Sequence, residues 1–532
     1  MPESYLERAR GHGGRIALMT PARTLTYGEL VSASVSVARE ILAAVAGTRR
    51  RGSRSPVGLD GAPVAFLCPQ SWEYAAVQWG VWAAGGMAVP LSPVHPEAEL
   101  SHVLDDAGPA VVVTHPNLRD RVDGPAGERG IPVLGSGGLL KGPSEGRGTD
   151  GGGPLPAHDP DRPALMLYTS GTTGRPKGVV LTHGNLEAQV RSMVEAWEWT
   201  AEDRILTHLP LHHVHGIVNV LVTALWCGAT CEMLPAFDAV TVWERLAERR
   251  TTLYMAVPTV YRRLLDAWDS ADAATRARWA AGAQACRLMV SGSAALPVPT
   301  LERWEAVTGH RLLERYGMTE IGMALSNPLR GERRPGFVGA PLPGVEARLV
   351  DEGGDPAPDG AAGEIQVRGP TVFREYWRRP GETAAAFAPG GWFRTGDLAM
   401  VEDGAFRILG RMSQDILKTG GEKVSALEIE DALRTHPGVA DCAVVGVPDP
   451  AWGERVCGAV VLRDGSGAES EVGSPPTPEK LRAFARERLA PYKVPKEIRI
   501  VDELPRNAMG KVTKGAVRAL FEGTAAPSGG DA

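Results

Sequence analysis

Lysine is scarce in this sequence, since only nine of its 57 basic residues are lysine and the others are arginine. Acidic residues number 63, which gives a formal net charge of −6. The chain therefore lacks the basic excess that is typical of nucleic-acid-binding proteins, and we expect no nucleic-acid partner. Lysine is a compact charge on a flexible stem, unlike arginine, so each retained lysine is a candidate for a specific task.

Cysteine is also rare, and its spacing forms no disulfide framework. The scatter of the six cysteines fits a reducing compartment; they are Cys68, Cys227, Cys231, Cys286, Cys442 and Cys457. The close pair at 227 and 231 has no further ligands at zinc-site spacing, so we expect buried side chains there and no metal. The N-terminal stretch MPESYLERAR has no apolar core and does not resemble a signal peptide. These features predict a cytoplasmic protein.

Long apolar runs are missing as well. Glycine and proline, 64 and 42 residues in all, interrupt every apolar stretch before the roughly 18 residues that a membrane-spanning helix needs. We therefore expect no membrane insertion. Apolar residues make up 43% and charged residues 23% of the chain, which is ordinary for a globular protein and excludes global disorder. A length of 532 residues allows about three domain-sized units.

The first four fifths of the chain show α/β patterning. Residues 164–168 and 287–290 are short apolar runs that predict buried strands. Residues 185–197 predict an amphipathic helix with Asn185 as its N-cap. Three stretches rich in Gly, Pro and polar residues predict loops or linkers, at 118–162, 464–478 and 523–532. We expect a large α/β domain with mixed sheets and helices over residues 1–410.

A different pattern follows Gly410. Ser425 and Glu428 have the spacing of a capping box that opens a helix through about residue 436. Strands are predicted at 442–447, 456–462 and 497–502, and a helix at 478–489. This pattern predicts a small mobile α+β domain over residues 411–522, followed by a disordered tail, 523–532.

The strongest local motif is YTSGTTGRPKG, which starts at Tyr168. A predicted strand runs into a loop of small and hydroxyl-bearing residues, whose backbone N–H groups can form an anion-binding concavity. Lys177 closes the loop and can place its charge near a terminal phosphate. The spacing does not satisfy the Walker A pattern. The candidate phosphate-binding residues are Thr169, Ser170, Gly171, Thr172, Thr173, Gly174 and Lys177.

Five further motifs accompany this loop. They are Arg315–Glu320 (RYGMTE), Gly396-Asp397, Gly410-Arg411, Lys418–Gly421 (KTGG) and Pro505–Lys511 (PRNAMGK). With the loop, they resemble the motifs of the adenylate-forming superfamily of acyl-CoA synthetases, peptide-synthetase adenylation domains and luciferases, in the same order and over nearly the whole chain. The resemblance implies activation of a carboxylic acid by ATP, with Mg²⁺ and coenzyme A as further requirements.

The resemblance also implies a role for each matching residue. Asp397 and Arg411 would bind the ribose, and Tyr316 would stack on the adenine along the segment Gly292, Ser293 and Ala294, with Gly317 and Met318 beside it. Thr319 would contact phosphate, and Glu320 would be the Mg²⁺ ligand. Lys511 would bridge the carboxylate and the α-phosphate, where preplaced cations lower the barrier.

The second half-reaction requires a path for the thiol of coenzyme A. Lys418, Gly420, Gly421 and Lys423 resemble the stretch that borders the pantetheine tunnel after the small domain rotates. The hinge is expected at residues 411–414. The segment GRMSQD has one residue more than the usual pattern of the superfamily.

The segments expected to line the acyl pocket are polar and basic, at 209–219, 256–263, 291–297 and 317–323. A cation and hydroxyls suit a second carboxylate on the substrate, because a buried carboxylate must be paired. These segments resemble those of malonyl-CoA synthetases. The resemblance assigns the distal carboxylate to Arg263, with Arg262 as the neighbouring alternative, about 100° away on a helix. The predicted acyl-site residues are His213, His215, Arg263, Ser291, Ser293 and Met323, with His213 also a catalytic candidate.

The leading hypothesis is therefore an ATP-dependent ligase that joins malonate to coenzyme A through an acyl-adenylate, with methylmalonate as a second candidate acid. Three alternatives stay open. The chain could activate short-chain, medium-chain or aryl acids, could load a carrier protein, or could be an inactive acid-binding regulator. The presence of Lys177, Glu320, Asp397 and Lys511 argues against the last of these.

Overall fold

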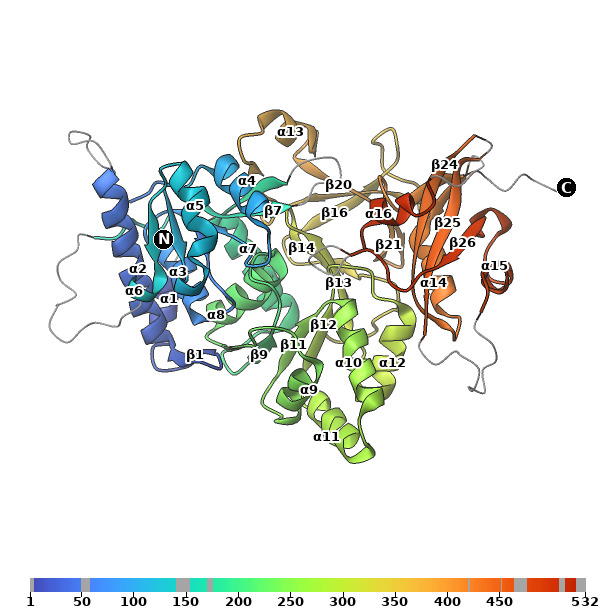
Figure 1. The fold of residues 1–532 in the computed structure, drawn as a ribbon, viewed down its shortest axis with the longest axis horizontal. Helices are drawn as coiled ribbons and strands as arrows, with labels where there is room; N and C mark the ends of the chain where they lie inside the picture. Colours follow the sequence, from blue (N-terminus) through green and yellow to red (C-terminus); the bar gives the residue numbers. More distant parts are fainter. Residues whose placement is uncertain are drawn as a thin grey trace.

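The computed structural model describes residues 4–48, 58–139, 154–169, 176–419, 422–450, 452–463, 476–506 and 512–522. Three sheets with surrounding helices form the larger part of the molecule, and a fourth sheet with its own helices lies at the end that carries the C-terminus (Figure 1). This arrangement confirms the predicted fold class. The boundary after residue 410 and the mobility of the smaller part stay predictions.

A nine-stranded sheet runs through the centre, in the order β15-β14-β13-β12-β11-β9-β10-β1-β2. Its strands are β1 (Ile16–Met19), β2 (Thr24–Thr26), β9 (Arg204–Thr207), β10 (Thr230–Met233), β11 (Leu253–Ala256), β12 (Leu288–Ser291), β13 (Leu313–Met318), β14 (Gly322–Ser326) and β15 (Ala340–Pro341). Strands β9, β11, β12 and β13 are parallel. Their carboxyl ends therefore meet at one edge of the sheet, where ligands bind in sheets of this kind.

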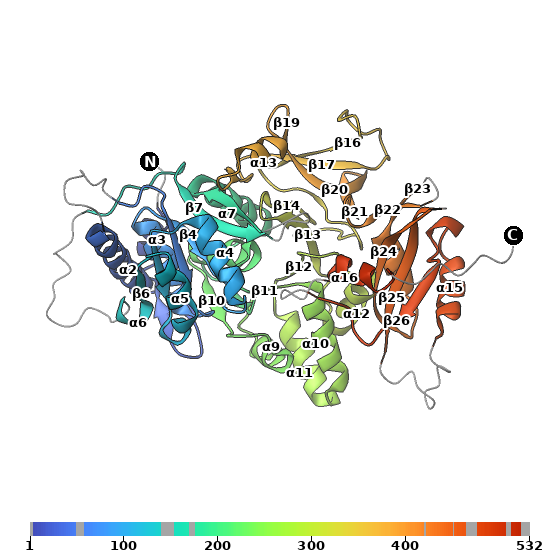
Figure 2. The same cartoon turned by 45° about the horizontal axis from the view of Figure 1, so that its top comes forward.

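Two further sheets flank the central one (Figure 2). The seven-stranded sheet has the order β18-β8-β7-β4-β3-β5-β6 and consists of β3 (Pro63–Leu67), β4 (Met87–Pro90), β5 (Val111–Thr114), β6 (Val133–Gly135), β7 (Pro163–Thr169), β8 (Lys177–Thr182) and β18 (Glu375–Tyr376). The other consists of β16 (Glu346–Val350), β17 (Gly363–Arg368), β19 (Phe387–Ala388), β20 (Trp392–Glu402) and β21 (Ala405–Arg411).

Helices cover these sheets. They are α1 (Tyr5–Arg10), α2 (Tyr27–Thr48), α3 (Trp72–Ala83), α4 (Glu97–Ala107), α5 (Asp120–Glu128), α6 (Ser136–Leu139), α7 (His183–Trp197), α8 (Thr223–Cys227), α9 (Ala239–Ala247), α10 (Pro258–Ser270), α11 (Ala273–Gln284), α12 (Val298–Thr308) and α13 (Pro380–Ala385), with the 3-10 turn η1 (Pro116–Leu118) and the π-helix η2 (His215–Val222). The apolar faces of α7, α9 and α10 explain why these segments are helical and packed on a sheet.

The sequence analysis expected glycine and proline to interrupt every apolar stretch before about 18 residues, and helix α2 is an exception. Residues Tyr27–Gly47 are long and apolar enough to cross a membrane by length and composition alone. The helix packs against α3 and buries Leu30, Val37 and Ile41 in the main hydrophobic core, which accounts for its apolar character.

The smaller part is an α+β module. Its sheet has the order β23-β22-β25-β24, with β26 beside β25. The strands are β22 (Ile416–Thr419), β23 (Glu422–Ser425), β24 (Val439–Asp449), β25 (Gly453–Leu462) and β26 (Glu497–Ile500), and the helices are α14 (Ala426–Arg434), α15 (Pro478–Arg486) and α16 (Lys514–Ala519), with the 3-10 turn η3 (Pro491–Lys493). Ser425 caps α14 as predicted, since its Oγ accepts a hydrogen bond from the Glu428 N–H at 3.2 Å. The Glu428 carboxylate pairs with Lys493 and does not complete the predicted capping box.

Two local predictions were wrong. The stretch 118–162 was expected to be a linker, but α5, β6 and α6 occupy residues 120–139, because Val122 and Ala126 pack in a core that the polar composition conceals. Helix α7 starts at His183 with Thr182 as its N-cap, and Asn185 instead closes a capping box, because its Oδ1 accepts a hydrogen bond from the Thr182 N–H at 2.9 Å. Most of the predicted linker 464–478 and the whole tail 523–532 lie outside the described residues.

Candidate active site

Three predicted nucleotide-binding residues meet where two sheets approach each other. Asp397 on β20 lies directly opposite Arg411 on β21, and the Arg411 guanidinium pairs with the Asp397 carboxylate at 3.0 and 3.2 Å. Tyr316 on β13 donates its hydroxyl to the same carboxylate at 2.5 Å. Burial, followed by the charge of Asp397, raises the pKa of Tyr316. The tyrosine therefore stays a neutral donor at physiological pH.

A second cluster surrounds Glu320, which lies in the turn between β13 and β14. Its carboxylate is buried and accepts a hydrogen bond from the Tyr376 hydroxyl at 3.0 Å. Burial raises the pKa of Glu320, whereas the Tyr376 hydrogen bond and the charges of Arg411 and Lys177 lower it. Lys177 lies over the Tyr376 ring at 5.2 Å and pairs with Glu382 of α13.

The phosphate-binding loop itself falls largely outside the described residues. Ser170, Gly171, Thr172, Thr173 and Gly174 lie there, and so does Lys511. The two ends of the loop are described: Thr169 ends β7 and pairs with Lys177 at the start of β8. The loop therefore joins two antiparallel strands and begins beside the Glu320 cluster.

The predicted acyl segments converge at the carboxyl end of β12. Ser293 has a left-handed backbone, φ +70°, a conformation that costs free energy in residues other than glycine. Its Oγ lies 3.2 Å from His215 Nδ1 and accepts a hydrogen bond from the Arg315 guanidinium at 3.4 Å. Gly292 permits this approach, because a Cβ there would lie 2.4 Å from Arg315 Nε.

Arg315 is a residue that the sequence analysis did not assign. It is only 5% exposed, and burial lowers the pKa of its guanidinium to about 10. Its Nε has no hydrogen-bond partner, and no carboxylate of the described residues forms an ion pair with it. The sequence did mark this position, since Arg315 is the first residue of the motif RYGMTE. A charged side chain on a strand is usually solvated, however, so the burial of Arg315 could be seen only in the fold.

Further polar atoms of the predicted acyl segments lack partners. His215 Nε2, Ser291 Oγ and Asn219 Oδ1 are buried without a hydrogen bond. Burial lowers the pKa of His215 well below its ordinary value, so its ring is neutral at pH 7. Buried polar groups are normally paired, so these unsatisfied atoms, together with Arg315 beside Ser293 and His215, fit a pocket for a polar anion.

The other predicted acyl residues lie in different surroundings. His213 is half-buried beside His212, and burial lowers its pKa to about 4. Met323 is buried on β14, where its N–H bonds the Gln189 side chain at 2.7 Å. Arg263 is exposed, with its guanidinium 4.5 Å from the Phe237 ring centre. The assignment of the distal carboxylate to Arg263 stays a prediction, and the structure offers Arg315 as the buried alternative.

Glu314 supports the loop that carries Ser293. Its Oε1 accepts a hydrogen bond from the Leu296 N–H at 3.0 Å, while its Oε2 is buried without a partner. Burial raises the pKa of Glu314 to about 8. Ala294 lies within the same loop, and Gly317, Met318 and Thr319 continue β13 toward Glu320. A Cβ on Gly317 would lie 2.1 Å from the Gly322 carbonyl oxygen, so glycine is required there.

The predicted coenzyme A residues form a strand pair in the smaller part. Lys418 on β22 lies opposite Lys423 on β23, and the Lys418 N–H donates to Glu454 at 2.7 Å. Gly420 and Gly421, at the turn between the strands, lie outside the described residues.

This combination of a hydroxyl-rich loop, an Asp–Arg–Tyr cluster and a buried acid beside a lysine defines an enzyme that binds a nucleotide. The chain belongs to the AMP-binding enzyme family: the family model matches residues 5–377, and the model of the AMP-binding enzyme C-terminal domain matches residues 428–511. It is 46% identical over 540 residues to the mitochondrial malonate–CoA ligase ACSF3 of Mus musculus, with 95% of this chain and 88% of that protein covered.

Two solved structures are similar to this chain over almost its whole length. ATP-bound MatB from Rhodopseudomonas palustris has a TM-score of 0.86 and 35% identity, with 98% of this chain and 99% of that chain covered. A malonyl-CoA ligase in a ternary product complex with methylmalonyl-CoA and AMP has a TM-score of 0.66 and 37% identity, with coverage of 95% and 100%.

Proposed function

We propose that this protein is an AMP-forming acid–CoA ligase that activates malonate. The observation that carries the choice of acid is Arg315, a buried guanidinium without a carboxylate partner among the described residues, with Ser293 and His215 beside it. A buried charge must be paired to be tolerated, and a planar guanidinium matches a carboxylate with two parallel hydrogen bonds. The distal carboxylate of malonate supplies that partner.

The order of residues on β13 supports this arrangement. Side chains alternate along a strand, so Arg315 faces Ser293 and the acyl segments, whereas Tyr316 faces Asp397 and the ribose contacts. The acid and the nucleotide would thus be held by consecutive residues of one strand. The reacting carboxylate of malonate would lie between them, close to the α-phosphate.

The reaction then proceeds in two steps. A malonate carboxylate oxygen attacks the α-phosphorus of ATP, the bond to the β-phosphate oxygen breaks, and pyrophosphate leaves. The thiol of coenzyme A next attacks the carbonyl carbon of malonyl-adenylate and releases AMP. Cations that are fixed in advance stabilise the charge that develops in the first step, and Lys177 and Lys511 are the lysines proposed for this task.

We also propose a requirement for Mg²⁺. The described residues hold no group of three or more acidic, histidine or cysteine ligands that could bind a metal on their own. Glu320 offers a single buried carboxylate beside the proposed phosphate site, which fits an ion that binds mainly through the nucleotide phosphates. The ion would neutralise phosphate charge there.

We infer that the described arrangement corresponds to the first half-reaction. The chain superposes more closely on the ATP-bound relative than on the product complex, with TM-scores of 0.86 and 0.66, although its identity to the two is nearly equal. This difference supports an arrangement closer to that of the ATP-bound relative.

A panel of acids tests the proposed substrate. With ATP, Mg²⁺ and coenzyme A, we expect malonate to be consumed with a higher kcat/KM than acetate, octanoate or benzoate, because only malonate pairs with Arg315. AMP release with and without coenzyme A measures both half-reactions. A higher kcat/KM for octanoate would overturn the diacid assignment and leave the ligase class intact.

The nucleotide end of coenzyme A has a candidate site in the smaller part of the molecule. A cavity of about 330 Å³ is lined by Arg482, Arg486, Pro491, Val494 and Lys496. Lys496 lies 4.1 Å from the ring centre of Trp452, which is 40% exposed. Burial lowers the pKa of Lys496, and the two arginines lower it further. A cationic cavity beside an exposed ring suits the phosphates and the adenine of coenzyme A.

Lys496→Gln tests this site. We expect KM for coenzyme A to rise about tenfold, the value of a lost charged hydrogen bond, and KM for dephospho-coenzyme A to rise less. Lys480→Gln is the matched control, since Lys480 is on α15 but outside the cavity lining. Unchanged KM values for both thiols in the Lys496 variant would show that the phosphates bind elsewhere.

Transfer of the acyl group to free coenzyme A, and not to a carrier protein, is part of this proposal. The cytoplasmic location and the absence of nucleic-acid and membrane partners also stay proposals. The mouse relative is described as mitochondrial, so fractionation of the native cell is the relevant measurement.

A further inference from the structure

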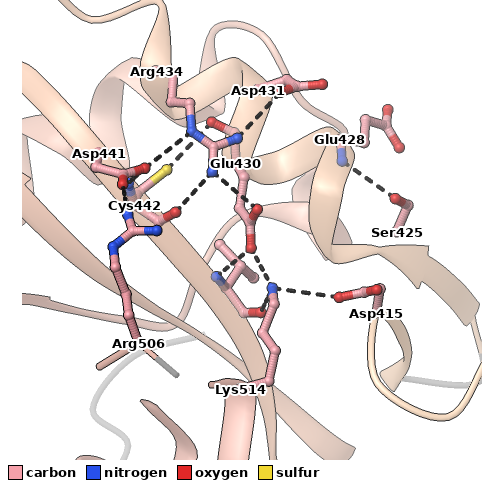
Figure 3. Close-up of polar contacts among 11 residues, drawn as sticks. Asp415, Ser425, Glu428, Glu430, Asp431, Arg434, Asp441, Cys442, Arg506 and Lys514 are labelled. Atoms are coloured by element: carbon pink, nitrogen blue, oxygen red, sulfur yellow. Dashed lines mark hydrogen bonds and ion pairs between the residues drawn. The ribbon is translucent and has the colours of Figure 1, made fainter. Parts of the chain in front are cut away.

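Two cations mark the ends of the segment that contains Lys511. On the N-terminal side, Arg506 forms an ion pair with Asp441 of β24. On the C-terminal side, Lys514 forms an ion pair with Glu430 of α14 and donates to the Val444 carbonyl oxygen at 2.7 Å. Figure 3 shows both side chains reaching into the same polar cluster from different directions.

The two ion pairs belong to one connected network. Arg434 of α14 lies between the acids, 3.4 Å from Asp441 and 3.2 Å from Glu430 (Figure 3). The Glu430 carboxylate is 5% exposed and also accepts a hydrogen bond from the Val444 N–H at 2.8 Å. The Lys514 side chain is 13% exposed. Partly buried ion pairs that share hydrogen bonds hold their geometry better than isolated surface pairs do.

Backbone bonds bring the two ends together. Arg506 and Val512 form a β-bridge, and the Thr513 N–H donates to the Pro505 carbonyl oxygen at 2.9 Å. The chain therefore leaves the network after Arg506 and returns to it at Val512. Both described ends of the segment are therefore connected to one cluster of charges.

The network also reaches the turn that follows the nucleotide contacts. Lys514 Nζ lies 3.5 Å from Asp415 Oδ1. The other oxygen of Asp415 accepts a hydrogen bond from the Arg411 N–H at 3.1 Å, and Arg411 pairs with Asp397. Asp415 thus connects the base of the Lys511 segment with the proposed ribose site through two direct contacts.

We propose that Lys514 is a positioning residue for the first half-reaction, which fixes the segment of Lys511 against Glu430 and Asp415 so that the Lys511 ammonium reaches the α-phosphate. The inference rests on the proposed function. It assigns no contact between Lys514 and substrate. The misplacement of a reacting group by about 1 Å can cost roughly 10²-fold in rate, so loss of Lys514 should slow adenylate formation by about 10- to 100-fold.

Lys514→Met tests the proposal when both half-reactions are measured separately in the full-length enzyme. Malonate-dependent exchange of pyrophosphate into ATP reports adenylate formation, and single-turnover conversion of purified malonyl-adenylate reports transfer to coenzyme A. We expect the exchange rate to fall about 10- to 100-fold and the transfer rate to change less than twofold. Lys514→Arg should restore part of the exchange, because a cation again meets Glu430.

Lys493→Met is the matched control. Lys493 also pairs with a glutamate of α14, Glu428, at 2.6 and 2.8 Å, but not at the Lys511 segment. We expect this variant to keep the exchange rate within twofold. Asp415→Asn, which leaves the Glu430 pair intact, should lower exchange by an intermediate factor. The melting temperature of each variant shows whether it folds.

Three outcomes would overturn the proposal. They are an equal loss of both half-reactions in a folded Lys514→Met, an unchanged exchange rate in it, and an equal loss in Lys493→Met. If the unchanged enzyme supports no exchange with malonate, the proposed substrate fails on its own. The same comparison then runs with whichever acid supports exchange, so the two failures are distinguishable.

Discussion

Lys511→Ala is expected to abolish adenylate formation and to spare the transfer of a preformed acyl-adenylate to coenzyme A. The alanine removes the cation proposed to bridge the carboxylate and the α-phosphate, where negative charge develops. Loss of one such contact in a site of this kind costs about 10²–10³ in rate or more. Pyrophosphate exchange measures the first step, and single-turnover transfer from purified malonyl-adenylate measures the second.

The contrast between the two steps is the informative result. If Lys511→Ala lowers both rates equally, Lys511 is a structural residue. The match of PRNAMGK to the superfamily motif would then not establish a catalytic role for this lysine. Lys511→Arg separates charge from shape, because the planar guanidinium is bulkier than an ammonium. We expect this variant to remain severely impaired in the exchange reaction.

Arg315→Met is expected to lower kcat/KM for malonate by about 30-fold or more. Removal of one partner from a buried charge pair costs about 2–5 kcal/mol, and about 1.4 kcal/mol corresponds to a factor of ten. The same change should leave turnover of butyrate unchanged or higher, since an apolar tail would no longer face an unpaired charge. The measurement is the ratio of kcat/KM values for malonate and butyrate in each variant.

Arg263→Met is the comparison that decides between the sequence-based assignment and the structure. Arg263 is exposed and stacked on Phe237, so we expect the malonate-to-butyrate ratio to change less than threefold. A large loss in the Arg263 variant with no loss in the Arg315 variant would restore the first assignment. If neither variant changes the ratio, His215 and Ser291 become the next candidates. Arg315→Lys keeps a positive charge at the site and is therefore the control for a loss of activity that is caused by misfolding.

The sequence predicted the framework of the site well because its signals are local. The strands at 164–168 and 287–290 and the cap at Ser425 follow from short apolar runs and from side chains that bond the nearby backbone, and the structure has each of them. The ribose contacts could likewise be placed, since Asp397 and Arg411 belong to compact motifs. Their direct pairing across β20 and β21 required the fold.

The features that the sequence did not predict concern burial, which a single sequence does not determine. Arg263 and Arg315 are both arginines beside apolar residues, and only the packing of β13 under the Ser293 loop buries one of them. Asn185 and Thr182 are both good N-caps by type, and tertiary packing selects the earlier one. The network around Lys514 joins residues up to 99 positions apart in the chain, so no local sequence pattern predicts it.

The close approach of Gly292 and Arg315 has a consequence for the divergence and redesign of this enzyme. Because any Cβ at position 292 would strike the guanidinium, position 292 cannot change freely while Arg315 stays. A lineage that abandons diacids must lose the arginine first, and a larger residue at position 292 becomes acceptable only afterwards, when it would fill the vacated volume. A library that aims at monoacid substrates should therefore vary the two positions together, since single replacements at position 292 would be rejected before their benefit could appear.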